Sequence, residues 1–189
     1  IALDHPARNY KDTNHKPEMV LALTRFQAVA GFRAPRRAVE VLAGLDSVLA
    51  RRMRRTLRLN PTRYGIRQVF SDVVSAATRP SPEEIDELVA EISVRFEAGM
   101  SPSLRVDSNV LKMAGTFAGD PGIAAALLLN PVTLQPGEAL FVPAGSVHAY
   151  ISGLGVEVMA SSDNVLRAGL TPKHIDVPEM LACVDYVAA

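Results

Sequence analysis

The sequence predicts a mixed β and α fold, a jelly roll or small β-barrel with an inserted helical lobe. Residues 25 to 126 repeat apolar side chains mostly at helical spacing, whereas residues 127 to 189 begin with short apolar runs separated by Gly and Pro turns. Short strands joined by such turns are typical of jelly rolls and barrels. We therefore divide the chain into a loop-like segment with a polar motif at 1–24, a helical lobe at 25–126 and a β segment at 127–189.

The loop-like segment carries the sequence Asn-His-Lys-Pro-Glu at positions 14–18. Pro17 stiffens the backbone, Glu18 is a plausible carboxylate ligand for a metal, and Lys16 supplies a cation suited to an oxyanion or phosphate. The first residues of the chain have neither an initiator Met nor a basic region. We interpret this start as an internal cut and not as a signal peptide.

Helix signals divide the central lobe. The first helical pattern runs from Arg36 to Leu59 and is closed by Asn60-Pro61. The second begins at Ser81, where a capping hydroxyl is followed by Pro and then by Glu84 three positions on. A third helix is predicted from Leu104 to Phe117, and a short apolar helix or turn follows it.

Strand signals continue to residue 160. The turn at 152–155 predicts a hairpin in which Tyr150 lies opposite Glu157 and His148 lies opposite Met159. Because side chains alternate along a strand, these four would share one face. A carboxylate on the face of a metal-binding His is a ligand, a base or a group that orients the His.

A second motif surrounds His148. Gly137, Pro143, Gly145 and His148 match the spacing Gly-x5-Pro-x-Gly-x2-His, which resembles the second motif of cupins. A neutral imidazole at a barrel mouth is a good ligand for zinc, iron or manganese. The first cupin motif, His-x-His-x3-4-Glu, does not occur, so the motif at 14–18 is the other candidate source of ligands. A polar stretch at 161–173 adds Arg167, which suits a phosphate or an enediolate.

Together these segments resemble type I phosphomannose isomerases. The family pattern reads Asn-His-Lys-Pro-Glu, then Pro-Gly-Glu-Ala and Pro-His-Ala-Tyr, then Ser-Asp-Asn-Val-x-Arg-x-Gly-Leu-Thr-Pro-Lys. It is matched over residues 9 to 33 and 119 to 180, with Val147 where Pro is common. The helical middle matches only in type, as the family's inserted lobe.

The resemblance implies a zinc-dependent isomerase that interconverts mannose 6-phosphate and fructose 6-phosphate through a cis-enediol. It implies zinc ligation by Glu18 and His148, which match two of four family ligands. The Gln and first His of the family precede this segment, so it implies weak zinc binding by these residues alone. Five further positions match residues of the family's active site, without showing which is the base: Arg167, Lys16, Glu157, Asp163 and His15.

Composition narrows the other classes of function. The net charge is zero, so no global field favours nucleic acid or a membrane. Ten Arg and two acids lie between Arg33 and Arg67, which we interpret as a solvated basic helical face. The single cysteine, Cys183, fits a reducing cytoplasm, and no apolar run is long enough to span a bilayer.

Two alternative functions stay open beside the isomerase, a cupin dioxygenase and a non-catalytic sugar-binding cupin. The absent first motif argues against the dioxygenase. The presence of Lys16 and Arg167 argues against the non-catalytic protein. A small sugar phosphate is the expected partner, and the sequence does not give the oligomeric state.

Overall fold

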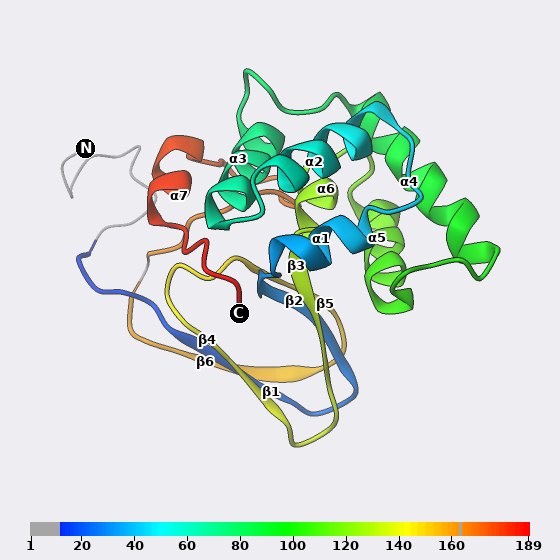
Figure 1. Cartoon of the computed structure of the whole chain (residues 1–189). Coiled ribbons are helices and arrows are strands. Elements are labelled where there is room, and N and C mark those ends of the chain that lie inside the picture. Colours follow the sequence, from blue (N-terminus) through cyan, green and yellow to red (C-terminus); the bar gives the residue numbers. More distant parts are fainter. Residues whose placement is uncertain (1–11, 163) are drawn as a thin grey trace.

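Two three-stranded antiparallel sheets and a helical layer make up the structure, a computed structural model that describes residues 12–162 and 164–189 (Figure 1). One sheet has the order β4-β1-β6 and the other the order β3-β2-β5. The strands are β1 (Glu18–Ala22), β2 (Phe26–Phe32), β3 (Leu129–Leu134), β4 (Ala139–Val142), β5 (His148–Ser152) and β6 (Gly155–Met159). The predicted mixture of helices and antiparallel strands is therefore confirmed.

The six strands form one three-stranded ribbon that is folded over on itself. β1 and β2 form its centre; β1 pairs with β4 and β6, and β2 pairs with β3 and β5. The chain passes from one sheet to the other at three corners, between β1 and β2, between β3 and β4, and between β5 and β6. These corners lie side by side, because the Leu23 N–H donates to the Leu154 carbonyl and the Gly137 N–H to the Ala22 carbonyl. The fold-over turns the two halves of the ribbon into facing sheets.

A small apolar core lies between the two sheets near the corners. It contains the buried side chains of Val20, Ala22, Phe26, Ala28 and Leu134. Alternation along β2 sends Val29 to the opposite face, where it joins the larger core beneath the helices. The β3-β2-β5 sheet is thus covered on both faces, by the other sheet and by helices (Figure 1).

The outer face of the β4-β1-β6 sheet is apolar and open. The register places Met19 between Phe141 and Val158, and Leu21 opposite Val156. These five side chains are 40–61% exposed.

The helices lie mainly between β2 and β3 in the sequence. They are α1 (Pro35–Val41), α2 (Val48–Leu59), α3 (Arg63–Val74), α4 (Pro82–Glu97), α5 (Leu104–Thr116), α6 (Gly122–Ala126) and, after the strands, α7 (Val177–Cys183). α4 has the predicted capping box, in which the Glu84 N–H donates to Ser81 Oγ and the Ser81 N–H to the Glu84 carboxylate. The predicted helix at 104–117 is α5, which ends one residue earlier.

Two predictions about the segments were wrong, and one helix was missed. Residues 18–22 form β1 and residues 26–32 form β2, so the helices begin at Pro35 and not near residue 25. The helical pattern from Arg36 to Leu59 is two helices, because the backbone turns at Gly44, which has a φ of +75°. A third helix, α3, follows the Asn60-Pro61 break.

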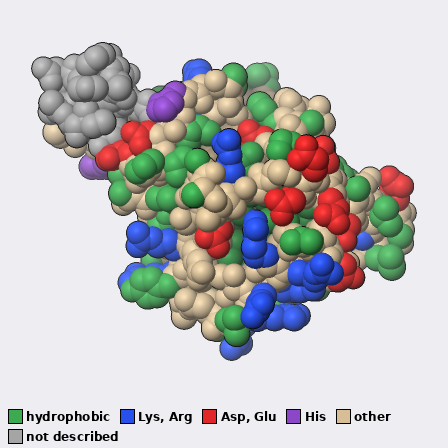
Figure 2. All heavy atoms as spheres, turned by 90° about the horizontal axis from the view of Figure 1, so that it is seen from above, with side chains coloured by type: hydrophobic (Ala, Val, Ile, Leu, Met, Phe, Trp, Pro, Cys, Tyr) green, Lys and Arg blue, Asp and Glu red, His purple; other side chains and the backbone are tan. Residues whose placement is uncertain are grey.

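Part of the basic face predicted between Arg33 and Arg67 lies on α2. Arg51, Arg52, Arg55 and Arg58 are exposed, while Leu49, Ala50, Met53 and Leu57 face the core. Figure 2 looks down on the helical side and shows basic side chains lying among acidic ones. No helix in the described ranges is long and apolar enough to cross a membrane.

A buried ion pair joins the helices. Arg95 of α4 donates to both carboxylate oxygens of Asp107 in α5, at 2.8 and 2.6 Å. Its other terminal nitrogen donates to the carbonyls of Val41 and Ala43, each at 3.0 Å. The side chains of Arg95 and Asp107 are 7% and 0% exposed, so each buried charge is balanced by the other.

We expect Arg95→Ala to lower the free energy of unfolding by about 3–5 kcal/mol, because it leaves a buried carboxylate and two carbonyls without partners. Urea unfolding measures this change. Arg37→Ala is the control, since Arg37 and Glu40 form an exposed pair at 2.8 Å and its loss should cost less than ~1 kcal/mol. Equal effects of the two substitutions would contradict the prediction.

Candidate metal centre

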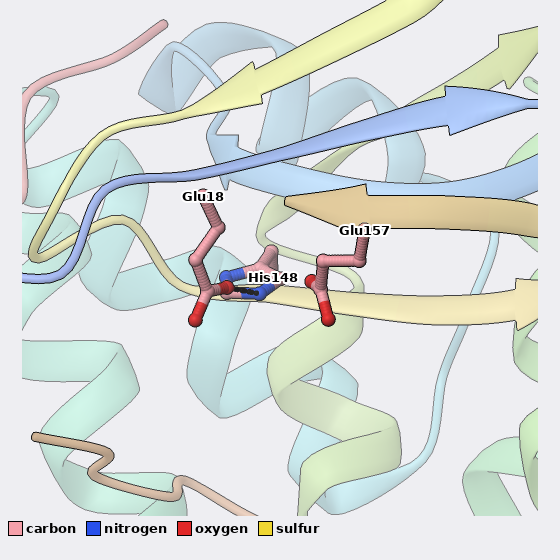
Figure 3. A group of neighbouring side chains, drawn as sticks. All are labelled: Glu18, His148 and Glu157. Carbon is pink, nitrogen blue, oxygen red and sulfur yellow. Dashed lines mark ion pairs between the residues drawn. The ribbon is translucent and has the colours of Figure 1, made fainter. Parts of the chain in front are cut away.

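Three side chains from three strands meet between the sheets. Glu18 opens β1, His148 opens β5 and Glu157 lies in β6. Each offers one ligand atom, and these atoms lie within 4.8 Å of one another. Figure 3 shows the His148 ring lying between the two carboxylates. His148 Nε2 is 3.0 Å from Glu18 Oε2.

Strand register explains why these side chains converge. In the β4-β1-β6 sheet Glu157 pairs with Val20, whose side chain is buried between the sheets. Glu18 lies two residues before Val20 and therefore points the same way. In the other sheet His148 pairs with Ala30, two residues beyond Ala28 of the small core. The site is thus the polar continuation of the apolar layer between the sheets.

The predicted hairpin of residues 148–159 was wrong, although three of the four side chains that it grouped, His148, Tyr150 and Glu157, do lie together. β5 pairs with β2 and β6 pairs with β1, so the two strands belong to different sheets. Gly153 lets the chain cross between them, with a φ of +115° and so little space that a Cβ would lie 2.7 Å from the Arg25 carbonyl oxygen. Tyr150 and Glu157 consequently face each other across the two sheets and not along one hairpin.

The tautomer of His148 is fixed by a backbone carbonyl. His148 Nδ1 lies 3.0 Å from the Ser146 oxygen, which can only accept, so Nδ1 carries the hydrogen. Nε2 then points toward the Glu18 carboxylate, 3.0 Å from Oε2. An imidazole nitrogen and a carboxylate oxygen are both common ligands of divalent metal ions. The donor chemistry therefore fits a divalent metal.

Tyr150 also lies in the site, although it was not among the predicted catalytic or metal-binding residues. Its hydroxyl donates to Glu157 Oε1 at 2.7 Å, and its ring contacts Phe26 edge-on with centroids 5.3 Å apart. Burial, and next the hydrogen bond to Glu157, raises the pKa of Tyr150 above its usual value. The hydroxyl therefore stays a donor. The strand alternation already placed Tyr150 with Glu157, and that was the signal for its contact.

A basic side chain adjoins the acidic pair. Lys16 Nζ is 3.6 Å from Glu18 Oε1, and both side chains are largely buried. His15 is exposed and Arg167 is half-buried, and within residues 12–162 and 164–189 no ion pair joins either one to the cluster. Asp163 lies outside the described residues.

Two loops from opposite ends of the chain are tied together beside the cluster. The Asn164 side-chain amide donates to the carbonyls of Asp12 and Asn14, at 3.1 and 2.5 Å. Ser162 Oγ donates to the same Asn14 carbonyl at 3.2 Å. The segment that carries Arg167 is therefore anchored to the segment that carries Lys16.

Comparison with known proteins places these motifs in one family. The family model of the catalytic domain of type I phosphomannose isomerase matches residues 1–35. Mannose-6-phosphate isomerase of Salmonella typhimurium is 39% identical over 189 residues, which is 98% of this chain and 45% of that protein. The chain belongs to the type I phosphomannose isomerase family.

Other relatives of the same family agree along the chain. The Escherichia coli mannose-6-phosphate isomerase is 37% identical over 100% of this chain and 46% of its own length. The human enzyme of that name is 36% identical over 95% of this chain and 44% of its own length. The chain thus spans about half the length of the curated relatives that it matches.

Solved structures of the family share the fold. A mannose 6-phosphate isomerase bound with zinc and yttrium matches with a TM-score of 0.80 and 36% identity, covering 100% of this chain and 46% of that one. The Salmonella typhimurium enzyme bound to its substrate, F6P, and to zinc matches with a TM-score of 0.78 and the same identity and coverage.

We expect Asn164→Asp to loosen the segment of residues 12–17, because a carboxylate replaces the donating amide and faces carbonyl oxygens. Hydrogen exchange of a peptide covering these residues should accelerate about tenfold or more, with global unfolding little changed. Asn60→Asp, in the loop after α2, is the control and should leave that peptide unaffected. Unchanged exchange in Asn164→Asp would show that the amide does not hold the two loops together.

Proposed function

We propose that this chain carries the catalytic centre of a zinc-dependent aldose–ketose isomerase that interconverts mannose 6-phosphate and fructose 6-phosphate. The observation that carries the proposal is the contact of 3.0 Å between Glu18 and His148. These residues come from family motifs 130 positions apart, and they meet as the ligand pair that the family resemblance implies.

Glu18 and His148 would hold the zinc ion, with the Ser146 carbonyl keeping the imidazole in the required tautomer. When bound, such an ion orients substrate hydroxyls and stabilises negative charge that develops on oxygen. Lys16 lies beside Glu18, so its ammonium group can bind a substrate oxygen at the edge of the metal centre.

The remaining catalytic roles are assigned to groups around this centre. Arg167 would bind the phosphate or an enediolate oxygen, since guanidinium groups bind planar oxyanions in pairs of hydrogen bonds. The proton moved between C2 and C1 through a cis-enediol would be handled by one of Glu157, Asp163 and His15. The substrate would be a free sugar phosphate, and the reducing cytoplasm that suits Cys183 would be its compartment.

We also propose that the two sheets are part of a cupin-like jelly roll. The fold-over of the ribbon, with strands passing between facing sheets at corners, supports this assignment. Residues 1–24 and 127–189 would then form the cupin part, and the helices within 25–126 would be an inserted lobe. The hydrogen bond from the Arg33 N–H to the Leu128 carbonyl, at 2.9 Å, brings the ends of that lobe together.

A chimeric enzyme tests the proposed activity. We expect residues 1–189, grafted in place of the matching segment of the Escherichia coli relative, to give a protein that converts mannose 6-phosphate to fructose 6-phosphate. A coupled assay of fructose 6-phosphate measures the rate, and metal analysis measures zinc. A folded, zinc-loaded chimera without turnover would refute the proposal.

In the same chimera, Arg167→Ala should lower turnover about 100-fold or more, because it removes an electrostatic stabiliser of the reacting anion. The zinc content should stay the same, because a guanidinium group is not a metal ligand. Arg37→Ala, on the exposed face of α1, is the matched control. Full turnover after Arg167→Ala would remove Arg167 from the catalytic set.

A further inference from the structure

A hollow on the helix side of the β3-β2-β5 sheet gathers cationic and aromatic side chains. It has a volume of about 230 Å³ and lies between the start of α3 and the chain that follows α7 (Figure 1). It is lined by Arg63, Tyr64, Arg67, Val184, Asp185 and Tyr186. We propose that this hollow binds a small phosphate monoester that carries hydroxyl groups, at a second site apart from the metal centre.

The floor of the hollow is an aromatic ring that is held in place. The Tyr186 ring stacks on Phe32 with centroids 5.5 Å apart, and it meets the Phe70 ring edge-on at 6.2 Å. Its hydroxyl donates to the Leu181 carbonyl at 3.1 Å. Phe32 and Phe70 belong to the close-packed core beneath the helices, so this floor is already formed before a ligand enters.

Two arginines from one face of α3 lie above aromatic rings at this hollow. The Arg67 guanidinium carbon is 5.7 Å from the centroid of Tyr186, and that of Arg63, one turn earlier, is 5.1 Å from the centroid of Tyr64. A guanidinium group over a ring keeps the N–H groups at its edge for oxygen acceptors. Arg63 uses one of them on the Tyr64 hydroxyl, at 3.2 Å.

The charge of the hollow favours an anion. Within residues 12–162 and 164–189, neither Arg63 nor Arg67 forms an ion pair with a carboxylate. The first turn of α3 has no acidic residue, so no carboxylate there neutralises the positive end of the helix dipole. A phosphate monoester carries a charge of about −1.5 to −2 at pH 7 and three acceptor oxygens, which suits two guanidinium groups.

Asp185 adds a requirement for a donor group on the same ligand. Its N–H donates to the Gly145 carbonyl, and its Oδ1 accepts from the Val187 N–H, each at 2.9 Å. These bonds fix the carboxylate at the hollow and leave Oδ2 for a further donor. A bare phosphate meets only repulsion from this carboxylate, whereas a hydroxyl group near the phosphate donates to it. The ligand class is therefore a polyol or sugar phosphate.

The hollow and the metal centre lie on opposite faces of one sheet. Val184 and Tyr186 pack against the core beneath the helices, whereas Glu18 and His148 meet between the two sheets. The inference therefore goes beyond the proposed function and does not depend on it.

Titration of the 189-residue chain with glycerol 3-phosphate, followed in the amide NMR spectrum, tests the site. This probe has the phosphate and the hydroxyl groups but is neither an aldose nor a ketose. We expect saturable shifts at residues 63–67 and 184–186, and about tenfold weaker binding of inorganic phosphate. Arg67→Gln should weaken binding of both probes about tenfold or more, because it removes a charged donor. Arg58→Gln, which removes the same charge from the exposed face of α2, is the matched control and should have no effect.

The role of Asp185 is tested by the same titrations. Asp185→Ala should abolish the preference for glycerol 3-phosphate over inorganic phosphate, because it removes both the repulsion of bare phosphate and the acceptor for the hydroxyl. Equal binding of the two probes by the unsubstituted chain would overturn the assigned ligand class.

The remaining outcomes separate this site from other binding of anions. Shifts that do not saturate, or that weaken as much in Arg58→Gln as in Arg67→Gln, would show general attraction to basic helices and overturn the proposal. Shifts confined to the surroundings of Lys16 and His148 would also overturn it, while leaving the proposed function intact. The spectrum itself identifies a variant that does not fold, and Arg63→Gln, at an exposed position, then takes the place of Arg67→Gln.

Discussion

The folding-over of one three-stranded ribbon is the constraint on which the structure depends. Its corners stack through the backbone hydrogen bonds of Ala22, Leu23 and Gly137, so the three strands must bend at one level. Every residue of the ribbon is then placed by its distance from a corner and by the alternation of side chains. The fold-over therefore produces two facing sheets with a shared interior. It also leaves the other face of the β4-β1-β6 sheet exposed.

The interior changes from apolar to polar with distance from the corners. Phe26 and Ala22 lie next to the fold, Tyr150 meets Glu157 farther along, and the Glu18–His148 contact comes last. The buried layer near the corners sets the separation of the sheets, and that separation sets the distance between carboxylate and imidazole. Packing and chemistry are therefore coupled, because a change in the small core would move one ligand relative to the other.

The sequence predicted those features that depend only on residues close together in the chain. The capping box at Ser81 and the alternation around Tyr150 were read correctly, because each depends on neighbours in the sequence. The pairing of β5 with β6 was predicted wrongly, because a glycine turn between two strands looks the same whether the chain reverses within a sheet or crosses to another. Only the distant strands β1 and β2 decide between these outcomes. The meeting of the motif at 14–18 with His148 was predictable from the family resemblance. No short sequence pattern marks the contact between Asn164 and Asn14.

The hydrogen bond between Arg33 and Leu128 has a consequence for how the chain reaches this fold. Lengthening a connection from about 6 to roughly 100 residues adds about 2.5 kcal/mol of closure entropy to the pairing of β2 with β3. The helices between these strands make mostly local contacts, which form fast, and once folded they hold their two ends together. Folding of the helical segment thus turns a remote strand pairing into a nearby one. The same closeness of ends makes this junction a position where the segment can be shortened or exchanged while the ribbon keeps its register.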